Sequence, residues 1–340
     1  MKTKKEEFVL KKRIVEILIA FVMLIVILIS YAYWNDKKNN ETNLETIKLA
    51  EVTHSPFYAP LYVAIENGYF EQEGLKIELI LTPGADKVAA AVLSGDVQVG
   101  FAGPESAIYV YEGKEENYLI TFAGLTKRDG QFIMGKEYIN NFTLEMLKGK
   151  EILVGRKGGM PALNFLNALK NSGINPDELN LNYSVEFAAL SGSFISGVGE
   201  YVNLFEPNAT ALENEGAGYV VASIGQLSGE MPYTAFYAQK SYMTNNEDTL
   251  KKFARAIDKG LKFVEENESE VIAKMILPQF PSTSLNELTS IVDRYKKADS
   301  YLSTTYISEE IFKNLESVMI DAGLLDDYVP YNELIKNINE

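Results

Sequence analysis

The sequence predicts an α/β protein of two lobes, each an open, mostly parallel sheet with helices on both faces, with a ligand cleft between the lobes. Four times a predicted strand leads into a loop, a proline, a helix and a glycine, over residues 60–68, 104–113, 161–173 and 207–216. Strands that alternate with helices favour open parallel sheets, in which ligands bind beyond the carboxyl ends of the strands. A chain of 340 residues is also too long for a single hydrophobic core.

Two of the four modules share more than their order. Residues 94–113 and 196–216 each contain a Ser-Gly pair, a short strand, a proline at the start of a helix, and a glycine nine residues after the proline. Proline suits the start of a helix because its missing N–H costs nothing there, and Gly113 is expected to be a left-handed C-terminal cap. One supersecondary unit used once in each lobe explains a repeat at this distance. We therefore expect the two helix starts to face a shared gap.

The remaining periodicity sets the lobe boundaries. Strands are predicted over 47–52, 75–81, 97–101, 118–125, 152–154, 181–187, 201–205 and 219–223. Residues 131–134 and 233–238 are expected to carry the chain from one lobe to the other. The C-terminal part shows amphipathic helices over 249–266, 270–277, 285–296 and 308–322. We place the first lobe at 47–129 plus 233–340 and the second lobe at 130–232.

The first 34 residues are expected to be a membrane anchor or a signal peptide. Lys11-Lys12-Arg13 precedes an apolar run from Ile17 to Ile29, which places the N-terminus inside the cell and the lobes outside. Ser30 and Ala32 suit cleavage by signal peptidase near Ala32. Residues 17–34 are, however, just long enough to span a bilayer. We favour the uncleaved anchor, with residues 35–46 as a polar tether and the lobes on the outer face of the cell membrane.

Composition excludes several classes of function. The net charge of −15 repels phosphate backbones and argues against nucleic-acid binding. The absence of cysteine removes disulfides, thiolate metal sites, cysteine nucleophiles and a lipid-modified cysteine anchor. A single histidine cannot build a nitrogen–sulfur metal site. No nucleophile elbow or zinc-protease motif occurs in the sequence, so we expect neither an enzyme nor a cofactor.

The candidate ligand contacts lie in loops after predicted strands. The first loop offers Thr53, His54, Ser55 and Tyr58, which can form hydrogen bonds or stack on a ring. A lone histidine is as often a surface or capping residue as a ligand contact. The glycine-rich loop 155–161 is similar to an anion cradle, but it lacks the Lys-Ser/Thr ending of a phosphate loop.

Glu105 and Glu206 flank the two repeat prolines. Either carboxylate could simply answer the dipole and free N–H groups of its own helix, and we favour this interpretation for Glu105. Glu206 precedes its proline and is expected to face the cleft, where it would receive an amino, amidine or ammonium group of a ligand.

Several of these motifs resemble those of ABC-importer substrate-binding proteins for nitrate, sulfonates and thiamine precursors. The matching residues are Tyr-Ala-Pro-Leu-Tyr-Val-Ala at 58–64, Gly-Tyr-Phe at 68–70, Glu-Gly-Leu at 73–75, Leu-Ser-Gly-Asp-Val at 93–97 and Phe-Glu-Pro at 205–207. The resemblance covers residues 47–236. It implies a periplasmic-binding-protein-like fold that closes on a small solute and delivers it to a membrane permease. The cleft residues that it implies are His54, Ser55, Tyr58, Gly103, Pro104, Glu105 and Glu206, together with Gly158, Gly159 and Met160.

The same superfamily includes a thiamine-pyrimidine synthase that consumes its own histidine and relies on a cysteine-rich motif, and the absence of cysteine here argues against that activity. Family members in Gram-positive cells are usually lipid-anchored, and in this chain the uncleaved helix would replace the lipid.

We therefore expect a monomeric solute-binding component of an ABC importer, whose partners are a small molecule and a permease. Acidic residues together with the stacking candidates Tyr58, Phe187, Phe194 and Tyr233 favour a nitrogen heterocycle such as a thiamine-type pyrimidine. A sulfonate or nitrate held by helix N-termini is the rival ligand. A sensor ectodomain and a pyrimidine-synthase-like enzyme are the alternatives of other classes.

Overall fold

Two mixed five-stranded sheets form the framework of the computed structural model, which describes residues 23–25, 30 and 44–339. The first sheet has the order β2-β1-β3-β10-β4 and the second the order β7-β6-β8-β5-β9. The strands of the first sheet are β1 (Glu45–Glu51), β2 (Leu75–Leu81), β3 (Val99–Ala102), β4 (Leu119–Thr126) and β10 (Thr234–Gln239). Those of the second sheet are β5 (Phe132–Gly135), β6 (Glu151–Leu153), β7 (Asn180–Asn182), β8 (Tyr201–Leu204) and β9 (Tyr219–Ser223).

Each sheet contains one strand that the chain forms directly after crossing over from the other sheet. Strand β1 pairs in parallel with β3, and β6 pairs in parallel with both β7 and β8. Strand β5, which follows the first crossing, is antiparallel to β8 and β9. Strand β10, which follows the second crossing, is antiparallel to β3 and β4. We call the first sheet with its helices the first lobe and the second sheet with its helices the second lobe.

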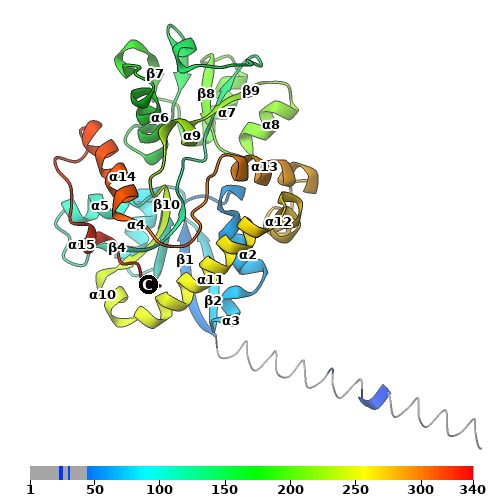
Figure 1. Ribbon diagram of the computed structural model, residues 1–340, viewed down its shortest axis with the longest axis vertical. Helices are drawn as coiled ribbons and strands as arrows, with labels where there is room; N and C mark the ends of the chain where they lie inside the picture. The colour runs from blue at the N-terminus through cyan, green and yellow to red at the C-terminus, as the bar shows by residue number, and fades with distance from the viewer. Residues whose placement is uncertain (1–22, 26–29, 31–43, 340) are drawn as a thin grey trace, which may run out of the picture. The chain divides into compact units, whose positions relative to one another are not determined.

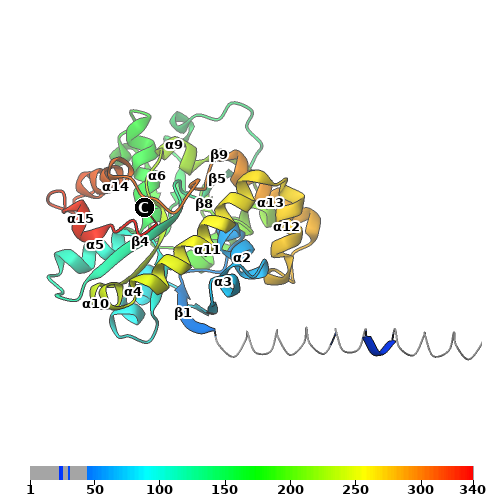
Figure 2. The ribbon, with the colours of Figure 1, turned by 60° about the horizontal axis from the view of Figure 1, so that its bottom comes forward.

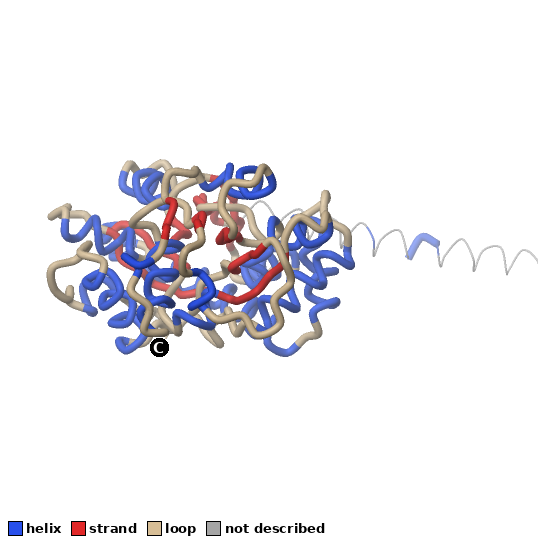
Figure 3. The backbone as a smooth tube through the Cα atoms, turned by 90° about the horizontal axis from the view of Figure 1, so that it is seen from above, coloured by secondary structure: helices blue, strands red, loops and turns tan. Residues whose placement is uncertain are grey.

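Helices enclose both sheets, so that the strands lie inside a helical shell (Figures 1 and 3). Residues 44–135 contain α2 (Ala59–Glu66), α3 (Tyr69–Gln72), α4 (Ala85–Leu93) and α5 (Glu105–Glu112). The second lobe contains α6 (Met160–Asn171), α7 (Leu190–Ile195), α8 (Asn208–Asn214) and α9 (Ile224–Ser228). After β10 come α10 (Lys240–Asn245), α11 (Glu247–Glu266), α12 (Ser269–Ile276), α13 (Leu285–Lys297), α14 (Glu309–Asp321) and α15 (Tyr331–Leu334). The 3₁₀ turns are η1 (Pro56–Tyr58), η2 (Leu144–Leu147), η3 (Pro176–Glu178), η4 (Phe187–Ala189) and η5 (Leu277–Gln279).

The long helix α11 helps to hold the first predicted ligand-binding loop in place. Its apolar face packs on α2 and α3, and Figure 2 shows it lying across both. Helix α12 packs on α2 as well, and α13 packs on α12 and on η1. These contacts hold η1 and the start of α2, where the first predicted loop lies, against the first sheet.

The local expectations are accurate for most elements and wrong at two places. Gly113 is right-handed with φ of −66°, and the left-handed residue is Lys114 with φ of 61°. The left-handed residue therefore lies one position after the glycine, while α5 itself ends at Glu112. The strand expected over 181–187 is confined to Asn180–Asn182, because the chain then turns into η4 and α7.

The N-terminal expectations fall almost entirely outside the described residues. Of the predicted anchor or signal peptide, 1–34, only residues 23–25 and 30 are described, and of the tether, 35–46, only residues 44–46. Within the described part of the chain, no helix has the length and apolar character needed to cross a bilayer.

Candidate ligand-binding site

The first loop of the first lobe touches the second lobe directly. Ser55 is the N-cap of η1, where its Oγ accepts the N–H of Phe57 at 3.3 Å. The same Oγ donates to the backbone carbonyl of Glu206 at 3.1 Å. Ser55 is buried, so this contact between the loops after β1 and β8 is shielded from water. Two of the predicted loops therefore meet.

Aromatic rings gather where these loops meet. Phe57 lies 5.4 Å from Tyr58, 6.0 Å from Phe205 and 5.8 Å from Tyr233, measured between ring centroids. A Cβ on Gly130 would lie 2.8 Å from the Phe57 ring, so only glycine lets the crossing segment approach so closely. Tyr58 and Tyr233 are both buried. Burial raises the pKa of both hydroxyls, and the nearby charges of Asp129 and Glu105 add to it.

The turn after β3 presents Glu105 to the second lobe. A Cβ on Gly103 would lie 2.0 Å from Glu105 Oε2 and 2.8 Å from Met160 Cγ, so this carboxylate lies against the start of α6. Pro104 and Glu105 are buried. Burial raises the pKa of Glu105 to about 7, while the N–H groups of Glu105 and Ser106 and the charge of Arg156 oppose the rise.

A second buried carboxyl group lies on the first crossing segment. Asp129 is 1 % exposed, and its Oδ1 accepts the N–H of Gln131 at 2.6 Å. Burial raises the pKa of Asp129 well above its ordinary value. The hydroxyl of Tyr233 opposes this rise, but it does not complete a hydrogen bond of normal geometry to Oδ2.

Several polar atoms around the crossing segments lack a partner among the described residues. They are Glu105 Oε2, Asp129 Oδ2, Gln131 Oε1 and the two side-chain amide atoms of Asn203. Buried polar atoms in folded proteins are nearly always hydrogen-bonded, so such atoms call for a donor from outside the chain. Four of the five atoms are oxygens that can accept hydrogen bonds, which favours a ligand that donates hydrogen bonds.

Glu206 has its partners within the protein. Its carboxylate accepts the Thr210 N–H at 2.8 Å and the Thr210 hydroxyl at 3.0 Å, and it forms an ion pair with Arg294. Burial raises the pKa of Glu206, and Arg294 opposes the rise. Glu206 thus contacts its own helix and Arg294 of the first lobe. The carboxyl group of Glu105 meets the N–H groups at the start of its own helix, as we expected, and only its Oε2 is unpaired. The neighbouring Pro207 is exposed, so only Pro104 of the two repeat prolines is enclosed.

His54, the single histidine, is held at both ring nitrogens. Nδ1 lies 2.8 Å from Glu51 Oε1, and Nε2 lies 3.0 Å from the carbonyl oxygen of Gln279. The Tyr62 hydroxyl donates to the other oxygen of Glu51 at 2.8 Å. The hydrogen bond that His54 donates to Glu51 raises the pKa of His54, burial opposes the rise, and the Gln279 carbonyl adds to it. Two acceptors around one ring favour the doubly protonated imidazolium.

This geometry predicts a pH-dependent stability. Because the pKa of His54 in the folded state is above its ordinary value of 6.5, its contribution is complete below about pH 6.5 and is lost as the pH rises through the folded-state pKa. We expect His54→Gln to lower the free energy of unfolding by about 1 kcal/mol at pH 6 and by less at pH 9. Urea unfolding at both pH values measures the difference, and an equal loss at the two values would contradict the protonated state.

The remaining predicted residues lie at the edge of this region. Gly158 accepts a hydrogen bond from the Tyr109 hydroxyl at 3.3 Å, and Gly159 is the N-cap of α6. Thr53 is half-buried in the first loop. Of the stacking candidates, Phe187 lies 5.8 Å from Phe205. Phe194 is instead buried in the second lobe with Lys136 over its ring, so the structure places it in the core.

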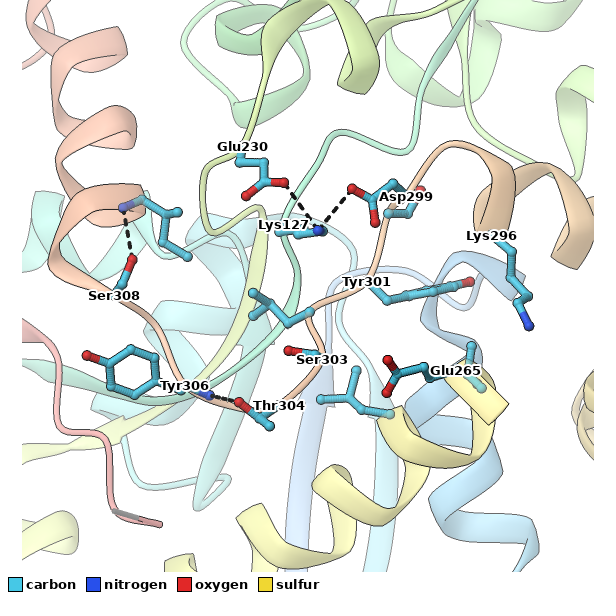
Figure 4. A pocket seen from close by; sticks show the side chains of 15 residues that line it. Lys127, Glu230, Glu265, Lys296, Asp299, Tyr301, Ser303, Thr304, Tyr306 and Ser308 are labelled. Atoms are coloured by element: carbon cyan, nitrogen blue, oxygen red, sulfur yellow. Dashed lines mark hydrogen bonds and ion pairs between the residues drawn. The ribbon is translucent and has the colours of Figure 1, made fainter. Parts of the chain in front are cut away.

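A separate pocket of about 520 Å³ lies beside the crossing segments and the C-terminal part of the chain. Figure 4 shows Lys127 between Glu230 and Asp299, at 3.2 Å and 2.9 Å respectively. Lys127 and Glu230 belong to the two crossing segments, and Asp299 follows α13. The described residues contain no grouping of side chains suited to a metal ion.

Sequence reasoning did not select Asp129, Gln131, Asn203 or Arg294. By itself the triplet Arg128-Asp129-Gly130 indicates only a turn before the crossing to the second lobe. Its burial depends on residues more than seventy positions away in the chain, such as Phe57 and Tyr233, and no local pattern reports such neighbours.

The model of the family described as NMT1/THI5 like matches residues 55–271. The chain belongs to the NMT1/THI5-like family. Among curated relatives, YtlA of Bacillus subtilis (strain 168), which is classed as a binding protein, is 40% identical over 296 residues, covering 87% of this chain and 89% of YtlA. The 4-amino-5-hydroxymethyl-2-methylpyrimidine phosphate synthase of Aspergillus parasiticus is 27% identical over 239 residues, covering 65% of this chain and 68% of the synthase.

Comparison with solved structures confirms the two-lobed fold expected for an NMT1/THI5-like protein. The alkanesulfonate-binding protein SsuA from Xanthomonas axonopodis pv. citri, bound to MOPS, aligns with a TM-score of 0.68 at 17% identity. The alignment covers 86% of this chain and 98% of SsuA. The resemblance to ABC substrate-binding proteins seen in the motifs is thus confirmed by the family and by the fold.

Proposed function

We propose that this protein is the extracytoplasmic solute-binding component of an ABC importer, and that its lobes close on a nitrogen heterocycle that carries an amino group. The observation that carries the proposal is the pair of unpaired, buried carboxyl oxygens, Glu105 Oε2 and Asp129 Oδ2, near Tyr58 and Tyr233. The permease would be its membrane partner, the lobe boundaries would lie at 129/130 and 232/233, and residues 1–34 would hold the lobes at the outer face of the membrane.

The chemistry of the donor set supports this class of ligand. When they are ionised, the two buried carboxyl groups repel an anion and accept hydrogen bonds from an amino or protonated ring nitrogen, and such a partner favours the ionised form. The rings of Tyr58 and Tyr233 offer faces for a flat heterocycle. A thiamine-type pyrimidine has both features, and the Aspergillus relative is named for an aminopyrimidine phosphate. In this proposal Ser55 and Glu206 join the lobes, while Glu105 and Asp129 contact the ligand.

An oxyanion is the second candidate, because one element of the site favours it. Helix α6 begins in the glycine-rich loop with Gly159 as its N-cap and no side-chain cap. Its first N–H groups could bind a sulfonate or nitrate. Glu105, however, lies against the same helix start, and its charge would oppose an anion there.

An enzymatic role has less support. The single histidine of the chain is held at both ring nitrogens, by Glu51 and by the Gln279 carbonyl. The chain also lacks the cysteines on which the synthase branch would rely.

The test is identification of the bound solute. The full chain would be purified without added ligand, denatured, and its small molecules analysed by mass spectrometry. Thermal shifts would then compare 4-amino-5-hydroxymethyl-2-methylpyrimidine with methanesulfonate. We expect the aminopyrimidine to add about 2.7 kcal/mol of stability at a hundred times its dissociation constant. Stabilisation by methanesulfonate alone would overturn the ligand class and favour the oxyanion.

A further inference from the structure

Helix α13 is built into the first lobe, yet its last turn reaches the second. It packs on α12 and η1 of the first lobe. Near its end, Arg294 forms ion pairs with Glu206, which lies just before α8, and with Glu213 in the last turn of α8. Its guanidinium carbon also lies 5.5 Å from the centre of the Phe132 ring on β5. Arg294 also donates to the Thr210 hydroxyl at 3.4 Å, so one side chain of the first lobe contacts four residues of the second.

The backbone of Glu206 is held from the same side. Its N–H donates to the Tyr295 hydroxyl at 3.1 Å, and its carbonyl accepts from Ser55 Oγ at 3.1 Å. Thr210 of α8 donates two hydrogen bonds to the carboxylate, and Arg294 contacts the same carboxylate from the first lobe. The side chain, N–H and carbonyl of one residue therefore all contact the first lobe, and its side chain is fully buried there.

The segment after α13 has contacts of its own with the first crossing segment and with β4. Asp299 pairs with Lys127 at 2.9 Å (Figure 4) and with Arg128 at 3.3 Å, and both cations lie on the first crossing segment. Beyond it, the Leu302 N–H donates to the Leu125 carbonyl at 3.0 Å, which adds this segment to the free edge of β4. Both ends of the segment that carries Arg294 are thus anchored outside the second lobe, and Arg294 cannot simply follow α8 when the lobes separate.

We propose that Arg294 is a positioning residue that latches the tip Glu206–Pro207 onto the first lobe and so sets the closed arrangement of the ligand site. The inference rests on the proposed function, in which the lobes close on a solute. Opening the lobes would separate Arg294 from a buried carboxylate, which strongly disfavours the open form. Removing the latch would increase the open population, and the apparent affinity would fall by the fraction of closed protein that is lost.

The experiment measures lobe separation without any ligand, by distance measurements between two spin labels on the full chain. Because the sequence contains no cysteine, Lys87→Cys and Lys157→Cys introduce two unique labelling sites. They flank Asp86 and Arg156, which lie 3.4 Å apart across the lobes, so opening must lengthen the distance between the labels. We expect one short distance in the parent, a second longer population in Arg294→Met, and partial recovery in Arg294→Lys.

Arg255→Met is the matched control, because Arg255 is also a helical arginine paired with a glutamate, Glu73, but within the first lobe. It should keep the short distance. A folded Arg294→Met with the parent's distances, or a parent already at the longer distance, would overturn the latch. If Arg294→Met does not fold, Glu206→Gln removes the charge that Arg294 pairs with and keeps the shape of the side chain, and an unchanged distance in that variant would also overturn the latch. These outcomes do not depend on ligand identity, so the latch can fail while the proposed function stands, and the reverse.

Discussion

Asp129→Asn is expected to weaken binding of an aminopyrimidine by roughly 10- to 100-fold, since a hydrogen bond to a charged group contributes about 1.5–3 kcal/mol. The substitution keeps the shape of the side chain, and its amide oxygen can still accept the Gln131 N–H that Oδ1 accepts now. It replaces the unpaired Oδ2, an acceptor, by an amide group that can only donate. Titration calorimetry on protein freed of co-purified solute measures the change.

The same variant should stabilise the ligand-free protein. A buried carboxyl group without a full set of partners costs free energy of folding, and burial raises its pKa for the same reason. We therefore expect Asp129→Asn to raise the melting temperature while affinity falls, a trade-off typical of binding sites. Glu105→Gln should act in the same two directions.

Glu316→Gln is the control for both variants. Glu316 is as buried as Asp129, at 1 % exposure, and its Oε1 accepts the Val329 N–H at 2.8 Å, outside the ligand-binding region. Its substitution should leave affinity unchanged. Unaltered affinity in both Asp129→Asn and Glu105→Gln, or tighter binding of methanesulfonate by either, would remove the role proposed for these carboxyl groups.

Gly260→Ala is expected to lower the free energy of unfolding by about 1–3 kcal/mol, the usual cost of overpacking. Gly260 lies in α11 where that helix meets α2, and an added Cβ would lie 2.2 Å from the carbonyl oxygen of Pro60. The atom in the way is backbone, so the helices must separate. The better helix propensity of alanine, worth about 1 kcal/mol, offsets only part of this cost.

Gly192→Ala supplies the matched comparison in urea unfolding. Gly192 lies in α7, and an added Cβ would meet nothing within 4 Å. That variant should be neutral or slightly stabilising. If the two variants unfold at the same urea concentration, the close contact between α11 and α2 does not limit stability. Because α2 begins next to η1, Gly260→Ala should also weaken ligand binding.

Much of the fold could be predicted because its signals are local. Strand β2 and strand β9 have the expected bounds, and helices α11 to α14 begin and end within about two residues of their amphipathic patterns. The exceptions have local competitors. Lys114 takes the left-handed conformation expected of Gly113, and a 3₁₀ turn at Phe187–Ala189 interrupts the predicted end of β7.

The candidate site could be predicted only as a set of loops. Glu105 lies beside Met160 at the start of α6 and near Tyr58, while Ser55 contacts the loop after β8. The roles of Glu105 and Glu206 could not be predicted from their local positions, because each is a carboxylate beside a proline at the start of a helix, Glu105 after Pro104 and Glu206 before Pro207. Their difference comes from a cation 88 residues from Glu206.

The sequence by itself determined the alternation of strands and helices, the repeated proline-led module and the family, because these depend on spacing and residue type along the chain. Only the tertiary structure decided which carboxyl group is satisfied. Arg294 reaches Glu206 but not Asp129. The carboxyl group of Asp129 is therefore buried without a cation beside it, and its Oδ2 has no hydrogen-bond partner. Electrostatic pairing at this range depends on distances of a few ångströms between segments far apart in sequence, and such distances exist only once the chain has folded.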